Sequence, residues 1–119
     1  MTDKELNDMV YSDNPWERRT AAMNGYGLDI LVHDKDSLVR RYVADQGHGL
    51  GILVNDGCSD VRAAVARQGY GLDILINDED DGVRRAVART GYKARELLRD
   101  YDSEVRLIAL DILLEKGEI

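Results

Sequence analysis

The chain has 119 residues, the size of one domain, and its 16 basic and 23 acidic residues give a net charge of −7. This acidic balance disfavours non-specific binding to nucleic acid or to an anionic membrane surface. The single cysteine excludes an intramolecular disulfide and a cysteine-based metal cluster, and no apolar run approaches the roughly 18 residues of a membrane span. Because the start, MTDKELNDMV, also lacks the pattern of a signal peptide, we expect a cytoplasmic protein that does not enter a membrane.

A motif that recurs every 22 residues dominates the sequence. It is clearest at residues 61–82, VRAAVARQGYGLDILINDEDDG, and related segments begin at Glu17, Val39 and Val83. A fixed period of this size indicates a stack of similar structural units. Arginine, glycine and aspartate keep the register. They stand at Arg18, Arg40, Arg62, Arg84 and Arg106; at Gly25, Gly47, Gly69 and Gly91; and at Asp34, Asp56, Asp78 and Asp100.

Residues 1–13 are predicted to form an N-terminal half-repeat that caps the stack. Leu6, Met9 and Val10 stand one period before the apolar residues of the next repeat's second helix. The segment therefore corresponds to the second helix of a repeat that lacks its first, as expected at the end of a stack.

Residues 14–102 are predicted to form four repeats, each with a helix, a glycine turn and a shorter second helix. In the second repeat, Val39 and Val43 share one face of the first helix. Gly47 and Gly49 follow, and glycine readily adopts the positive φ of a tight turn. The second helix then carries a short apolar stripe, which consists of Leu50, Leu53 and Val54.

Each first helix should begin after an N-cap residue, whose side-chain oxygen accepts a hydrogen bond from a free backbone amide. The predicted N-caps are Asn14, Asp36, Asp80 and Asp102. Glu17 follows Asn14 at the spacing of a capping box. Cys58 occupies the same column but is a poor cap, so we predict that Cys58→Asp is neutral or stabilising.

Residues 103–119 are predicted to form a longer C-terminal capping helix that ends near Gly117. Its core face continues through Val105, Ile108 and Ile112. A second apolar stripe lies beside that face, although a cap normally presents a polar surface to water. This stripe consists of Leu107, Leu110 and Leu114. It is a candidate homodimer interface; the alternative is that the helix folds more deeply over the last repeat.

The string D-x-x-V-R-x-x-V-A, present as DSLVRRYVA, SDVRAAVA and DDGVRRAVA, resembles the variant leucine-rich repeat and the short HEAT-like repeats. The resemblance covers residues 14–106, although Gly-Tyr-Gly or Gly-His-Gly stands where the variant leucine-rich repeat usually has a proline-containing turn. It implies an all-α, right-handed superhelical solenoid of paired short helices that acts as a binding or scaffolding surface. These families share no catalytic residues, so we expect a non-enzymatic, protein-binding module.

The arginine column has two interpretations. It could form a row of guanidinium groups for phosphates or acidic peptide, which would make the chain a nucleic-acid-binding protein. Alternatively, each arginine pairs with an aspartate across the junction between repeats, which the acidic net charge favours. A third hypothesis is an acidic inhibitor that occupies a basic site on a nucleic-acid enzyme. Its phosphate mimics would be Asp29, Asp73 and the column Asp34, Asp56 and Asp78.

Two sets of variable side chains are candidates for contact with a protein partner. The polar positions of the second helices comprise Asp29, His33, Asn55, Asp73, Asn77, Arg95 and Arg99. The positions between the turn glycines comprise Tyr26, His48, Tyr70 and Tyr92. The alternatives are that the first set is ordinary solvated surface and that the second set packs over neighbouring turns. The two histidines lie in different columns, so we predict neither a metal site nor a cofactor.

Overall fold

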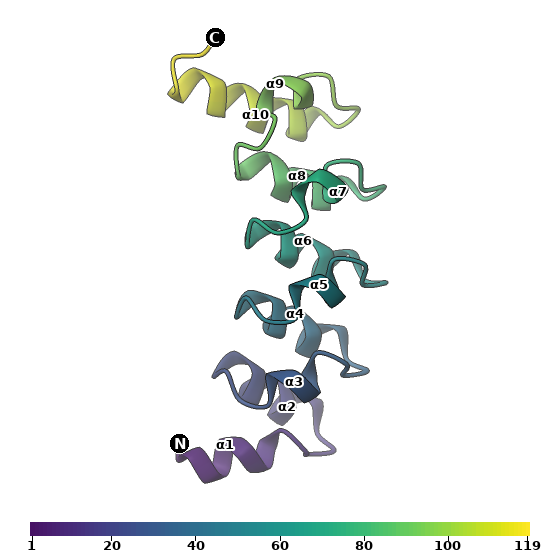
Figure 1. The fold of residues 1–119 in the computed structure, drawn as a ribbon, viewed down its shortest axis with the longest axis vertical. Coiled ribbons are helices and arrows are strands. Elements are labelled where there is room, and N and C mark those ends of the chain that lie inside the picture. The colour runs from purple at the N-terminus through teal and green to yellow at the C-terminus, as the bar shows by residue number, and fades with distance from the viewer.

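The computed structural model describes all 119 residues and consists of ten α-helices without strands, which confirms the all-α class. The molecule is elongated, with principal extents of 53 × 25 × 20 Å. Figure 1 shows the helices one above another along the longest axis, with the two chain termini at opposite ends.

Longer and shorter helices alternate after the first. The longer ones are α2 (Pro15–Met23), α4 (Ser37–Asp45), α6 (Ser59–Arg67), α8 (Asp81–Arg89) and α10 (Ser103–Glu115), and their first residues lie 22 positions apart. The shorter ones are α3 (Leu28–Leu31), α5 (Leu50–Leu53), α7 (Leu72–Leu75) and α9 (Ala94–Leu97). The N-terminal helix α1 (Asp3–Met9) packs against α2.

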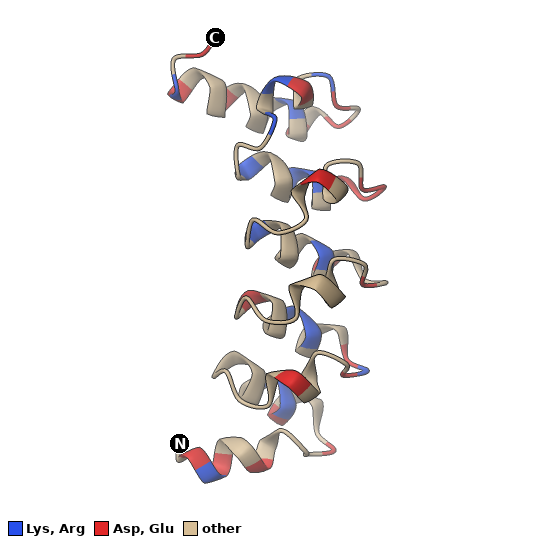
Figure 2. Cartoon of the chain, in the orientation of Figure 1, with Lys and Arg blue, Asp and Glu red and all other residues tan.

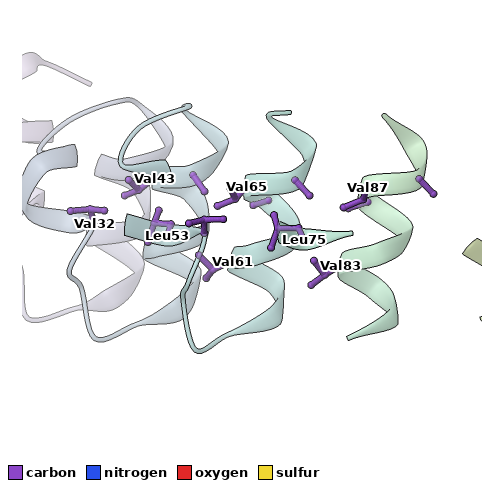
Figure 3. Close-up of a cluster of buried hydrophobic side chains, with 14 of the residues drawn as sticks. Val32, Val43, Leu53, Val61, Val65, Leu75, Val83 and Val87 are labelled. Carbon is purple, nitrogen blue, oxygen red and sulfur yellow. The ribbon is translucent and has the colours of Figure 1, made fainter. Parts of the chain in front are cut away.

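The long helices form a continuous layer, because each contacts the next in the order α2, α4, α6, α8 and α10. On one side of this layer, α3, α5 and α7 each contact the long helix before and the long helix after (Figure 1). The aliphatic core runs between the two sets of helices. Figure 3 shows Val61 and Val65 of α6 in this core with Leu53 and Leu75 from the short helices. Leu53 and Leu75 are each 1% exposed, so one leucine of each short helix anchors it.

The predicted N-caps are confirmed, and Cys58 makes no capping hydrogen bond through its side chain. The predicted capping box at Asn14 is wrong. Glu17 instead accepts a hydrogen bond from the Ser12 hydroxyl at 2.7 Å, so its carboxylate does not reach the N-cap amide. A complete capping box does form at α1, between Thr2 and Glu5.

Each short helix follows a left-handed residue, and where that residue is glycine it lies close to the valine 17 positions earlier in the chain. Gly49 has a φ of 64°, and a β-carbon built there would lie 2.5 Å from the Val32 Cγ2 atom. Only glycine satisfies both conditions without strain. Lys93 takes this position before α9 and is the one non-glycine residue with positive φ, at 47°.

The two ends of the stack are covered differently. Helix α1 buries Leu6, and Val10 directly after it is also buried, while the remaining α1 surface is polar. The core face of α10 is shifted from the prediction: Ile108 and Ile112 are only partly buried. The fully buried residues of α10 are Val105, Ala109 and Leu113.

Candidate protein-binding surface

The arginine and aspartate columns pair with each other, as the second interpretation of the sequence predicts. Each of the first four arginines forms a two-pronged ion pair with the aspartate sixteen residues later, and we call this series the arginine–aspartate ladder. The Nε–Oδ2 distances are 2.7 Å for Arg18–Asp34, 2.8 Å for Arg40–Asp56, 2.8 Å for Arg62–Asp78 and 2.9 Å for Arg84–Asp100. Figure 2 shows the acidic residues of these loops along one edge of the stack.

The same arginines also tie successive loops together. The Arg62 Nη1 atom donates to the Asp56 carbonyl at 2.8 Å, while its other nitrogens bind Asp78 in the following loop. The Asp78 Oδ1 atom in turn accepts from the Asp80 N–H at 2.9 Å. Each loop is therefore held by the arginine before it and the arginine after it, which fixes the positions of the short helices between them.

The ladder is largely removed from water. In the third ion pair the side chains of Arg62 and Asp78 are 14% and 9% exposed. The hydrogen bond with Asp78 raises the pKa of Arg62. Burial alone would raise the pKa of Asp78, but hydrogen bonds from Arg62 and the Asp80 N–H outweigh burial and hold that pKa below its usual value. Both groups stay charged, and their hydrogen-bonding capacity is used inside the protein.

A second set of arginines binds the N-cap aspartates. Arg19 pairs with Asp36 at 2.7 Å and Arg85 with Asp102 at 2.9 Å. The next member of this column, Arg41, would meet residue 58, which is cysteine. Its Nε atom is buried without a hydrogen-bond partner, the one such side-chain atom in the protein.

The tyrosine and histidine residues of the turns reach back onto the preceding repeat. The Tyr26 hydroxyl donates to Asp3 of α1, and the His48 Nε2 atom lies 2.6 Å from an Asp29 oxygen. The Tyr70 hydroxyl covers Gly51, because a β-carbon built at Gly51 would lie 3.2 Å from it. Tyr92 is likewise half-buried against the core. Tyr26, His48 and Tyr92 are therefore partly buried by contacts within the protein, whereas Tyr70 remains 44% exposed.

The polar residues predicted on the second helices are all exposed. They are Asp29, His33, Asn55, Asp73, Asn77, Arg95 and Arg99. They lie on α3, α7 and α9 or within two residues after a short helix, and Figure 1 shows the short helices in front of the long-helix layer. We call the exposed surface of the four short helices and the residues directly after them the short-helix face.

Sequence reasoning missed the apolar residues at the centre of this face. Ile30, Ile52 and Ile74 are 49%, 55% and 56% exposed and stand 22 residues apart on α3, α5 and α7. Three half-exposed isoleucines in register form a regular apolar row between the polar positions. The available signal was that the four-residue segment LDIL carries three apolar residues, more than one face of a single helical turn can bury.

The C-terminal leucines are also exposed. Leu107 and Leu114 are 58% and 55% exposed, and Leu110 between them is half-buried. These leucines therefore do not fold over the preceding helices. A different residue of α10, Leu113, packs into the core and is 2% exposed.

No group of three or more histidine, cysteine, aspartate or glutamate side chains is arranged to hold a metal ion. None of the helices has the length and apolarity needed to cross a bilayer. A shallow hollow of about 290 Å³ lies beside α10 and is lined by Lys93, Arg95 and Lys116 together with two glutamates.

No family model matches the chain, and a search of curated proteins finds no relative.

Proposed function

We propose that the chain is a right-handed superhelical solenoid of 22-residue repeats that binds another protein through the short-helix face and has no enzymatic activity. The observation that carries this proposal is the row of Ile30, Ile52 and Ile74, each about half exposed on successive short helices. Apolar side chains that repeat along an elongated surface are typical of protein-binding sites, because the water released when a partner covers them gains entropy.

The chemistry around the row gives specificity. Its neighbours change from repeat to repeat, from Asp29 and His33 on the first to Arg95 and Arg99 on the fourth. Polar groups around an apolar centre select partners by charge and by hydrogen bonding. The first three repeats favour a basic or neutral partner segment, and the fourth favours an acidic one.

Nucleic-acid binding is the weaker alternative. The guanidinium groups of Arg18, Arg40, Arg62 and Arg84 are occupied by aspartates, so they offer phosphates few free donors. The acidic-inhibitor hypothesis loses most of its proposed phosphate mimics for the same reason. Asp34, Asp56 and Asp78 are only 8–9% exposed, which leaves Asp29 and Asp73 as accessible carboxylates.

The proposal is tested by quantitative capture of proteins from source cells with three forms of the chain. These are the wild type, a triple variant Ile30→Asp, Ile52→Asp, Ile74→Asp, and a control Met23→Asp, whose residue is 52% exposed on α2. We expect at least one protein to bind the wild type and the control but not the triple variant. Equal recovery on all three forms would refute the short-helix face as the binding site.

The nucleic-acid alternative has a separate test. Fluorescence anisotropy with a labelled DNA duplex at low and high salt should show no specific binding. Tight binding with a steep salt dependence would replace the proposal with the alternative.

A further inference from the structure

We propose that two copies of this chain associate through their α10 helices, side by side and parallel, around the leucine row Leu107, Leu110 and Leu114. This surface lies at the end of the stack, away from the short-helix face, so the inference does not rest on the proposed function.

The column of Leu110 is buried on every earlier long helix, since Ala22, Ala44, Ala66 and Ala88 are all 0% exposed. Leu110 stands 22 residues after Ala88, which is fully buried between α8 and α10. On α10, the last long helix of this structure, Leu110 is half-buried and its neighbours Leu107 and Leu114 are more than half exposed. In this structure no helix covers the leucine row.

The row has the spacing of a two-helix seam. Leu107, Leu110 and Leu114 are separated by three and four residues, which are the a, d and a positions of a heptad. Side chains at this spacing lie along one stripe of a helix and interlock with the same stripe of a second helix.

Charged side chains beside the stripe indicate a second copy as the occupant. Arg106 precedes the first leucine and Asp111 follows the second, so they occupy the g and e positions of the heptad. In a parallel pair, a g residue faces the e residue five positions later on the other helix. Arg106 of each copy would therefore face Asp111 of the other, which gives two symmetric ion pairs. An antiparallel pair centred on the leucine row would instead place Asp111 opposite Asp111 of the other copy and would separate the two Arg106 side chains from these carboxylates.

Arg106 has unused capacity for such a bond. In the four ladder pairs the arginine Nε and Nη2 atoms bind an aspartate, whereas Arg106 uses only Nη1, which donates to the Asp100 and Tyr101 carbonyls. Its Nε and Nη2 atoms have no protein acceptor, and the residue is exposed. A carboxylate from a second copy would complete the pattern that Asp34, Asp56, Asp78 and Asp100 complete on the earlier arginines.

The opposite end of the stack favours a closed pair over an open chain of copies. The outer surface of α1 presents Lys4, Asn7 and Asp8, all exposed. This polar surface does not match the leucine row, so head-to-tail growth is disfavoured and a two-fold pair of C-terminal ends is the matching arrangement.

The test is the mass in solution, by light scattering or sedimentation, at chain concentrations up to about 1 mM, since a contact between two α10 helices of 13 residues is smaller than a standard interface. We expect a concentration-dependent dimer for the wild type and a folded monomer for Leu107→Asp with Leu114→Asp. Ile52→Asp with Ile74→Asp, at equally exposed residues on the short-helix face, should leave the dimer unchanged. A wild type that remains monomeric over the whole range, or a dimer that survives the leucine substitutions, overturns the proposal.

Charge exchange tests the pairing and its direction. Arg106→Asp and Asp111→Arg should each weaken the dimer by about tenfold, because each opposes like charges, and the double exchange should restore it. In a Cys58→Ala background, Leu107→Cys should form a disulfide between copies under mild oxidation, because the two residues 107 are adjacent only in a parallel pair. Failure of both the rescue and the crosslink would overturn the parallel arrangement.

Discussion

Arg62 and Asp78 are joined by two hydrogen bonds, 2.8 Å from Nε to Oδ2 and 3.0 Å from Nη2 to Oδ1. The arginine comes from a long helix, and the aspartate comes from the loop after the following short helix. A planar guanidinium that meets a carboxylate in this way fixes orientation as well as distance. The ladder therefore sets the angle at which each short helix lies on the long-helix layer.

Loss of one ladder carboxylate should be costly. Asp78→Asn leaves the mostly buried Arg62 without a counter-charge, and we expect the free energy of unfolding to fall by about 3 kcal/mol. The same substitution at exposed Asp73 should change it by less than about 0.5 kcal/mol. Urea denaturation followed by circular dichroism measures both. Similar values for the two variants would show that the ladder contributes little to stability.

Acid should destabilise the protein in a defined range. The hydrogen bond from Arg85 lowers the pKa of Asp102 to about 2, and the pKa values of Asp36 and Asp78 are also lowered. An unfolded aspartate has a pKa of about 3.9, so the unfolded chain binds more protons below that pH. Stability should be complete above about pH 4 and should fall as the pH drops towards about 2.

The matching control is Asp102→Asn, which keeps an N-cap but has no carboxylate to titrate. Its stability should depend less on pH between about 4 and about 2 than that of the wild type. An identical pH dependence in urea melts of the two proteins would exclude Asp102 as a contributor.

Replacement of Cys58 by aspartate should increase the stability of the protein. The carboxylate introduced by Cys58→Asp would cap α6 and could accept from the buried Nε atom of Arg41, as Asp36 does from Arg19. We expect this substitution to raise the free energy of unfolding by up to about 1 kcal/mol. In an Arg41→Ala background the gain should shrink to that of the cap alone. A loss of stability would mean that core packing by the thiol outweighs both effects.

The left-handed glycines should not tolerate a side chain. Gly49→Ala adds a β-carbon at positive φ and against Val32, so we expect a loss of about 2 kcal/mol or more. Gly57→Ala is the control, because no atom lies within 4 Å of its added β-carbon. Thermal melts of the two variants should differ clearly, and equal melting temperatures would contradict the assigned turn geometry.

Adjacent residues of a short helix should respond in opposite ways. Leu53 is 1% exposed and Ile52 is 55% exposed. Leu53→Ala should therefore cost about 3 kcal/mol, while Ile52→Ala should cost less than about 0.5 kcal/mol. Chemical denaturation of both variants checks this. A large loss at Ile52 would mean that the isoleucine row supports the fold and is not a free surface.

The parts of the structure that repeat could be read from the sequence. Long helices, their aspartate caps and the Arg40–Asp56 type of pairing follow from periodic spacing, because each is repeated in almost every unit. The capping box at Asn14 was mispredicted because Glu17 has a closer partner in Ser12, a contact that lies outside the local pattern.

The candidate surface was only partly predictable. The exposed polar positions follow from the apolar stripe of each short helix. The exposure of Ile30 does not, because in a helix of one turn the direction of each side chain is set by the left-handed glycine before it and by contact with two long helices. The free Nε and Nη2 donors of Arg106 could not be predicted either, because in the sequence Arg106 has the same 22-residue spacing as the four arginines that are paired.

Each long helix packs against its immediate neighbours in the stack. Removal of residues 59–80 would therefore leave Arg40 with Asp56 and Arg84 with Asp100, and Arg84 would meet the Asp56 carbonyl in place of that of Asp78. Valines of the same kind would close the gap. The length of the stack could therefore change by whole units of 22 residues without any change in the kind of contact between neighbouring units.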